Sequence, residues 1–307
     1  MKRQLLLAST AATTLTIAGS YAAFTWTQAQ AQTPQEVEIK FSARVGNQPL
    51  DCGKSYSNLG KPATTVTPTD FRFYVSDLAL IDANGKVVPI SLKQDGKWQY
   101  QNVALLDFEN KAGACSNGTV EMRDRVIGTI PKGNYKGLQF TLGVPFNLNH
   151  SDAALAPSPL NLTSLWWNWQ GGYKFLRIDL KNESGTKTNA SEKEHGQHGH
   201  EGNQTGFSIH LGSTGCQASG DNQKPNSCSN PNTTKVILSN FDTNNNTVVA
   251  DLEPLVANSN LETNQPNTPL GCMSSPNDGD CAGIMTSLGL PFGGKSAVKQ
   301  TFFTVKK

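Results

Sequence analysis

The chain has 307 residues, of which 36% are hydrophobic and 16% are charged, and it is rich in Gly (28) and Pro (16). This composition excludes a coiled-coil or long-helix protein, which would need more Ala, Glu, Lys and Leu. The 13 Phe, 6 Tyr and 5 Trp exclude a disordered chain, because they can build a large core. A formal net charge of +2 is too small for a nucleic-acid-binding surface.

The N-terminus predicts a signal peptide at residues 1–31. Two basic residues precede an apolar stretch at 5–24, and an Ala-Gln-Ala cleavage site follows at 29–31. Ser, Thr and Gly interrupt the stretch, which favours cleavage; an uncleaved anchor is the alternative. The remaining chain has 24 basic and 24 acidic residues and no later segment of membrane-spanning length. We therefore expect an exported protein in the periplasm, at the cell surface or secreted.

Period-two alternation of apolar residues predicts strands along the remaining chain, with 37–45 as the clearest example. We expect further strands at 71–81 (with a bulge at 76–77), 86–92, 98–108, 135–142, 173–180, 207–211, 235–238, 247–252 and 301–305, and one short helix at 282–288. Many short strands joined by long polar loops predict an all-β fold, an antiparallel β-sandwich or an open barrel. No composition break divides residues 32–307, so we expect one domain.

The six cysteines all lie after the signal peptide, and none has a zinc-type spacing. Proximity along the chain favours pairs Cys216–Cys228 and Cys272–Cys281, each within a polar loop, which leaves Cys52 with Cys115. Disulfides suit an exported protein, and we expect them to pin irregular loops.

Three of the five histidines, His195, His198 and His200, lie in a stretch at about 182–206 that has no large apolar residue. This stretch predicts a mobile loop between two strands. Imidazoles so close together can bind Cu(II), Ni(II) or Zn(II), as an accessory metal loop. The opposing interpretation, a solvated loop that binds metal opportunistically, is favoured because ordering a loop costs conformational entropy.

His150 and His210 stand apart from this loop, near the ends of predicted strands. A lone histidine is usually a hydrogen-bonded structural residue, but two near strand ends could share a metal ion. Between them, Trp166, Trp167 and Trp169 concentrate three of the five tryptophans, with Trp167 and Trp169 on one face of an extended segment. This cluster fits an aromatic core plug, a carbohydrate-stacking platform or oxidisable indoles beside a metal.

Common enzyme motifs are absent from the sequence, including the nucleophile elbow, the Walker loop, the dinucleotide fingerprint and the zincin motif. A pair of carboxylates among Glu38, Asp70, Asp77 and Asp179 could serve a hydrolase. In a β-protein such carboxylates more often cap loops or pair with Arg. We therefore expect a protein that is not an enzyme.

Several phrases taken together resemble the MbnP-like proteins, also called the metallo-mystery-pair four-cysteine-motif family. In chain order they are Asp70–Asp77, Gly137–Phe146, Leu148–His150, Ala156–Asn161, Trp167–Phe175, His210–Cys216 and Gly271–Met273. Each phrase is weak alone, whereas the ordered set is specific. The resemblance covers residues from about 37 to the C-terminus, and this chain has six cysteines where the family name counts four.

The resemblance implies an exported copper-binding protein whose partner is a di-haem cytochrome of the peroxidase/MauG type. In such pairs the cytochrome is thought to oxidise a tryptophan to kynurenine, and in related surface proteins a kynurenine and two histidines surround copper. Carried over to this chain, it implies His150 and His210 as copper ligands. Trp169 is then the first candidate for modification, because the Gln-Gly-Gly-Tyr-Lys-Phe phrase follows it, and Trp167 is the second. The alternative function is a carbohydrate-binding module that uses Trp166–Trp169 and needs neither histidine.

Overall fold

The structure is a computed structural model that describes residues 33–183, 206–220 and 223–307. Residues 33–307 form one compact unit. The predicted signal peptide, most of the predicted loop and the three loop residues His195, His198 and His200 lie outside the described residues. Among the helices in the described ranges, none has the length and apolarity that crossing a membrane requires.

The smaller sheet in the described part of the chain has six strands in the order β20-β18-β1-β9-β6, with β2 paired to β1. Its strands are β1 (Pro34–Val45), β2 (Gln48–Pro49), β6 (Ser91–Leu92), β9 (Arg125–Pro131), β18 (Thr247–Asp251) and β20 (Phe303–Lys306). The predicted alternation in β1 is confirmed, because Val37, Ile39 and Phe41 are buried while Lys40 is exposed. β1 is antiparallel to β9 but parallel to β18.

The larger sheet has ten strands within the described ranges, with β17-β10-β4-β13-β14-β19 as its main path. These strands are β4 (Thr64–Asp82), β10 (Tyr135–Leu142), β13 (Leu176–Asn182), β14 (Phe207–Leu211), β17 (Thr234–Ser239) and β19 (Gly271–Cys272). The others are β3 (Tyr56–Leu59), β5 (Val87–Pro89), β7 (Gln99–Tyr100) and β8 (Val103–Asp107). The long central strand β4 pairs with β3, β5, β8, β10 and β13.

Aromatic side chains join the two sheets. Phe41 of β1 contacts Phe73 of β4 and Phe140 of β10, with ring centroids 6.1 and 5.7 Å apart. Phe303 of β20 approaches the same two rings to 5.5 and 5.1 Å. Edge-to-face contacts at these distances stabilise a core beyond the burial of apolar area. The two sheets therefore pack as a β-sandwich, and the open-barrel alternative is not realised.

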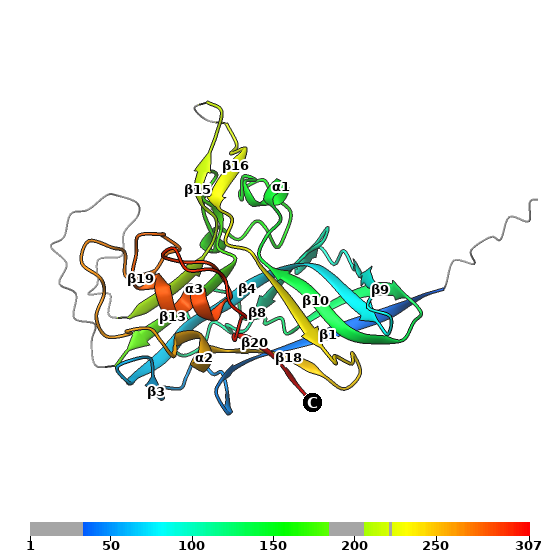
Figure 1. The fold of residues 1–307 in the computed structure, drawn as a ribbon, viewed down its shortest axis with the longest axis horizontal. Helices are drawn as coiled ribbons and strands as arrows, with labels where there is room; N and C mark the ends of the chain where they lie inside the picture. The colour runs from blue at the N-terminus through cyan, green and yellow to red at the C-terminus, as the bar shows by residue number, and fades with distance from the viewer. Residues whose placement is uncertain (1–32, 184–205, 221–222) are drawn as a thin grey trace, which may run out of the picture. The chain divides into compact units, whose positions relative to one another are not determined.

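Shorter elements lie around the sandwich. They are helices α1 (Phe146–Asn149), α2 (Leu252–Val256) and α3 (Cys281–Ser287), the 3₁₀ helix η1 (Thr163–Leu165), and two hairpins formed by β11 (Trp166–Asn168) with β12 (Gly172–Tyr173) and β15 (Thr214–Gln217) with β16 (Ser227–Asn230). The β15–β16 hairpin projects beside α1 (Figure 1). The predicted helix at 282–288 is confirmed within one residue at each end.

All three predicted disulfides are present: Cys52–Cys115, Cys216–Cys228 and Cys272–Cys281. Every cysteine of the first and third pairs is at most 3% exposed, whereas Cys216 and Cys228 are half-buried. The middle pair joins directly opposed residues of the β15–β16 hairpin. It is the disulfide that pins a projecting loop, as expected.

Some predicted strand boundaries are wrong. The segment 86–92 divides into β5, which pairs with β4, and β6, which pairs with β9, so the chain crosses from one sheet to the other at Ile90. The segment 98–108 turns back on itself at Gln101, whose φ is +51°, and forms the β7–β8 hairpin. The predicted bulge is confirmed, with Asp77 at a φ of +52° and a register shift against β10. The sheets are mainly antiparallel, but the β1–β18 and β14–β19 pairs are parallel.

Candidate metal centre

His210 lies on β14 at one end of a polar row that crosses the larger sheet. The register places His210 opposite Arg177 of β13 and Arg177 opposite Arg72 of β4. Arg72 in turn lies opposite Asp107 of β8. Because directly opposed residues project from the same side of a sheet, this row lies on one face. The apolar neighbours of these residues along each strand project from the other face, into the core.

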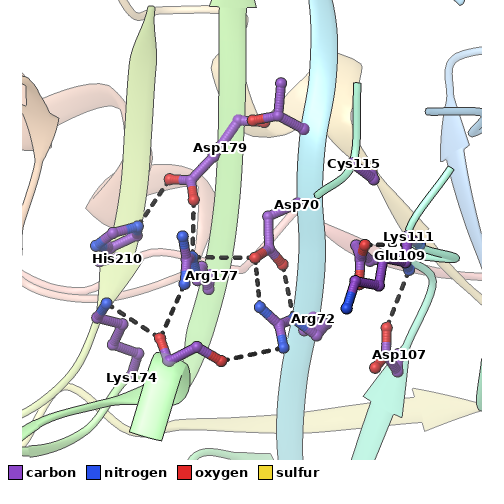
Figure 2. Close-up of polar contacts among 12 residues, drawn as sticks. Asp70, Arg72, Asp107, Glu109, Lys111, Cys115, Lys174, Arg177, Asp179 and His210 are labelled. Carbon is purple, nitrogen blue, oxygen red and sulfur yellow. Dashed lines mark hydrogen bonds and ion pairs between the residues drawn. The ribbon is translucent and has the colours of Figure 1, made fainter. Parts of the chain in front are cut away.

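Two carboxylates connect the row (Figure 2). Asp179 accepts a hydrogen bond from His210 Nε2 at 2.7 Å through Oδ1, and one from Arg177 Nε at 2.7 Å through Oδ2. Asp70 accepts from Arg72 Nε at 2.8 Å, and Arg177 Nε lies 3.1 Å from its other oxygen. Asp70 and Arg72 are at most 1% exposed. The imidazole is thus held by a buried ion-pair network rather than by a single contact.

The network sets the protonation of His210. Burial lowers the pKa of the His210 imidazole, and the nearby cations of Lys174 and Arg177 lower it further, against the opposite effect of Asp179. Burial alone would raise the pKa of Asp179, but the hydrogen bond from His210 and the charge and hydrogen bond of Arg177 outweigh burial and hold this pKa below its ordinary value. A neutral imidazole beside an ionised carboxylate must donate its Nε2–H, because the carboxylate can only accept.

This tautomer leaves the lone pair of His210 on Nδ1. Within residues 33–183, 206–220 and 223–307, Nδ1 has no hydrogen-bond partner. A neutral imidazole whose second nitrogen is anchored by a carboxylate is the usual form of a metal-binding histidine, since the anchor fixes the ring and raises its basicity. His210 therefore has the chemical state that a copper ligand needs.

Trp167 lies close to the same strand. A β-carbon at Gly212 would lie 2.4 Å from the Trp167 ring, so the indole covers this glycine. Gly212 directly follows β14, two positions after His210. Trp166 instead packs against the core, with an indole Nε1 that has no partner among the described residues. Trp166 and Trp167 are successive residues of β11, and successive side chains of a strand project to opposite faces.

His150 caps the C-terminus of α1 and is 3% exposed. Its Nδ1 lies 3.1 Å from the carbonyl oxygen of Trp169 and donates to it. Nε2 therefore carries the lone pair; it lies 3.3 Å from Asn149 Nδ2 and 3.6 Å from Cys228 Sγ. Burial lowers the pKa of His150, so this imidazole is also neutral.

The two histidines have separate hydrogen-bond partners. Asn149 links their surroundings, because its Nδ2 lies 3.4 Å from Ser213 Oγ, three residues after His210. In the described ranges, one group of three His, Cys or carboxylate residues has ligand atoms within 4.8 Å of one another; it contains His150, Cys216 and Cys228. Both cysteines are in a disulfide, so the group offers no thiolate in this state.

A pocket of about 410 Å³ opens between Trp167 and the β15 strand. Its lining includes the thioether of Met273 and the hydroxyls of Ser213 and Thr214. Trp167 contributes the aromatic surface, whereas Trp169 lies outside the lining and is 36% exposed. The three tryptophans therefore do not form a common flat platform, which weakens the carbohydrate-binding alternative.

The acid-pair alternative also loses support. Asp70 and Asp179 form ion pairs with arginines. Glu38 lies 3.4 Å from Arg125, and Asp77 accepts a hydrogen bond from Asn102. Sequence reasoning named Asp70 and Asp179 but missed their partners Arg72 and Arg177. The signal was available, since Asp and Arg alternate with buried apolar residues at 70–73 and 176–179. It also missed Lys174, Asn149 and Met273, which carry no motif of their own.

Asp107, at the far end of the polar row, gives a pH-dependent prediction. Its Oδ1 accepts from the Glu109 amide, but its buried Oδ2 has no partner among the described residues, and burial raises its pKa to about 7. The folded state therefore binds the proton of the Asp107 carboxyl more tightly than the unfolded chain does. Because of this difference, the free energy of unfolding decreases as the pH rises from about 4 to 7. Asp107→Asn keeps the acceptor without the titration.

We therefore expect the free energy of unfolding of Asp107→Asn, measured relative to the wild type, to increase by roughly 2–4 kcal/mol between pH 4 and pH 8. Urea unfolding of both proteins at the two pH values measures this difference. An equal difference at both pH values would show that Asp107 does not titrate in this range.

Comparisons with known proteins agree with the motifs. The MbnP family model matches residues 34–274. Among solved structures, MbnP from Methylosinus trichosporium is similar at a TM-score of 0.76 and 29% identity, over 89% of this chain and 98% of that one. A comparison with curated proteins gives no match. The resemblance stated from the sequence is confirmed: this chain belongs to the MbnP family.

Proposed function

We propose that this protein is an exported copper-binding protein of copper homeostasis with no catalytic activity of its own. Membership of the MbnP family supports a copper-associated role in a methanobactin-related system. The observation that carries the proposal is the carboxylate-anchored, neutral imidazole of His210, whose Nδ1 lone pair is uncommitted among the described residues.

In this proposal His150 and His210 hold the copper. Two neutral imidazoles fit Cu(I), which accepts a low coordination number and nitrogen or sulfur donors. Each ring has one nitrogen fixed by the protein, His150 through the Trp169 carbonyl and His210 through Asp179. Met273 lines the pocket next to Trp167, and its thioether is a soft donor of the type that Cu(I) prefers. Bound copper would supply a one-electron redox couple.

We further propose that a di-haem cytochrome of the peroxidase/MauG type oxidises Trp167 or Trp169 to kynurenine. Trp167 is the first candidate on structural grounds, because its ring covers Gly212, two positions after His210, and lines the pocket. Trp169 is the second, because its carbonyl holds His150 and its indole is 36% exposed. Kynurenine at either position would place an aromatic amine and a ketone near one of the histidines.

Mass spectrometry of the protein from its own host tests this function. A native spectrum reports bound copper, and the tryptic peptide 137–174 contains His150, both candidate tryptophans and Trp166. We expect copper together with one tryptophan that has gained an oxygen and lost a carbon, and fragment ions assign its position. Metal-free protein with three intact tryptophans would contradict the proposal.

A further inference from the structure

We propose that the Cys216–Cys228 disulfide is the closed form of a second, redox-gated metal site. Its reduction releases two thiols beside His150, and the three side chains together bind a thiophilic cation of the Cu(I)/Zn(II) class. The site shares His150 with the proposed copper centre but does not rest on it, because it forms in the reduced protein and does not use His210.

The ligand atoms are already close together. His150 Nε2 lies 3.6 Å from Cys228 Sγ, and all three potential ligand atoms lie within 4.8 Å of one another. Metal–sulfur bonds of about 2.3 Å and metal–nitrogen bonds of about 2.0–2.1 Å place neighbouring ligand atoms roughly 3.5–4 Å apart. The separation of His150 Nε2 and Cys228 Sγ already lies in this range, whereas the two bonded sulfurs must move apart.

The hairpin holds the two thiols in position after reduction. Cys216 and Cys228 are directly opposed on β15 and β16, and flanking pairs at Thr214–Asn230 and Gln217–Ser227 continue the ladder. Opposed residues of a hairpin project to the same face, so both sulfurs stay on the side of His150.

The imidazole also presents the required nitrogen. The Nδ1–H bond to the Trp169 carbonyl, at 3.1 Å, fixes the tautomer and leaves the lone pair on Nε2, which lies 3.3 Å from Asn149 Nδ2 and 3.6 Å from Cys228 Sγ. An N–H anchored on a backbone carbonyl is the usual outer support of a metal-binding histidine. His150 is thus oriented as a ligand whether or not the disulfide is closed.

Exposure makes this disulfide the one that a reductant reaches first. Cys52, Cys115, Cys272 and Cys281 are at most 3% exposed, whereas both cysteines of the hairpin are half-buried. Thiol–disulfide exchange requires access of the attacking thiolate to a sulfur. The fold therefore protects two disulfides and leaves the third open to exchange.

The reductant is an exported dithiol of the thioredoxin class. Two successive exchanges convert the protein disulfide into two thiols and the dithiol into its own disulfide, a transfer of two electrons and two protons. The metal cation then displaces the two thiol protons, which pass to solvent, and forms two metal–thiolate bonds, while neutral His150 supplies the third bond through Nε2.

Cobalt(II) tests the site, because thiolate ligation gives it an intense near-ultraviolet charge-transfer band. The full chain is reduced with a phosphine, freed of reductant without air, and titrated with Co²⁺. Alkylation and peptide mapping count the thiols in parallel. We expect two thiols, at Cys216 and Cys228, and a band that saturates at one Co²⁺ per chain, while the oxidised protein gives none.

Two variants establish the ligands. His150→Gln keeps a polar side chain but removes the imidazole, and it should weaken Co²⁺ binding by about tenfold or more. Ser227→Ala, an exposed change beside Cys228, is the matched control and should bind as the wild type does. Equal affinity in His150→Gln, no band after reduction, or release of four or six thiols together would each overturn the proposal. Cu(I) binding that depends on His210 is measured separately, on the oxidised protein.

Discussion

Replacing His210 with alanine should remove high-affinity Cu(I) binding from the oxidised protein, with a loss of at least about 100-fold. His210 supplies a neutral imidazole that is anchored by a carboxylate and has its nitrogen lone pair on Nδ1. Its ion-pair partners Asp179 and Arg177 carry no neutral nitrogen that could replace this ligand. Alanine leaves Asp179 paired with Arg177, so the sheet should remain intact. Competition with a chromogenic Cu(I) chelator measures the affinity.

The anchor gives a graded test of the same prediction. Asp179→Asn keeps an acceptor for His210 Nε2–H but removes the charge, and changes of this type in outer-shell partners cost about 10–100-fold in metal affinity. His150→Ala should also lose affinity if both histidines hold one ion. Ile237→Ala, an exposed position on β17, is the control and should bind copper as the wild type does. Unchanged affinity in His210→Ala would show that copper binds elsewhere.

Removing Asp70 should destabilise the protein by about 3–5 kcal/mol. Asp70 is fully buried and pairs with Arg72, which is 1% exposed, and with Arg177. Asp70→Ala leaves the Arg72 guanidinium buried with one neutral contact, Ser164 Oγ at 3.3 Å, and the more distant Asp107. An uncompensated buried charge of this kind is strongly unfavourable, whereas an intact buried pair contributes little net stability.

A double variant separates the lost charge from the lost packing. Asp70→Leu combined with Arg72→Met replaces the pair by apolar side chains, and it should be clearly more stable than Asp70→Ala alone. Urea unfolding monitored by tryptophan fluorescence measures all three proteins. If Asp70→Ala lies within about 1 kcal/mol of the wild type, the network does not depend on this carboxylate.

The sequence predicted the fold best where local pattern and tertiary environment agree. β1 alternates because one face of its sheet packs on the core, and β10 and β14 were found for the same reason. The strands predicted at 86–92 and 98–108 were wrong. The first segment crosses between the two sheets and the second contains a tight turn, and in both the apolar residues continue through the break, so periodicity does not reveal it. The hairpin β15–β16 was missed because its polar strands bury no continuous face.

The candidate site was predictable only in part. Motif resemblance identified His150, His210 and the tryptophans, but the partners that give each histidine its protonation state come from strands far apart in the chain. Arg177 meets both Arg72 and His210 through the register of three strands, and no local signal sets that register. The proximity of Cys228 to His150, 78 positions away, arises from the placement of the hairpin beside α1.

The parallel pairing of β1 with β18 also governs the order in which this protein can fold. Lys40 of β1 lies opposite Thr247, and β18 is itself covered by β20, which ends at Lys306. β1 can pair earlier with β2 and β9, but its parallel neighbour β18 lies about 200 positions downstream and is paired in turn with β20. Pairings of such long sequence separation slow folding, because loop-closure entropy is lost before the contacts form. A nascent chain can therefore complete the smaller sheet only when β18 and β20 have been synthesised.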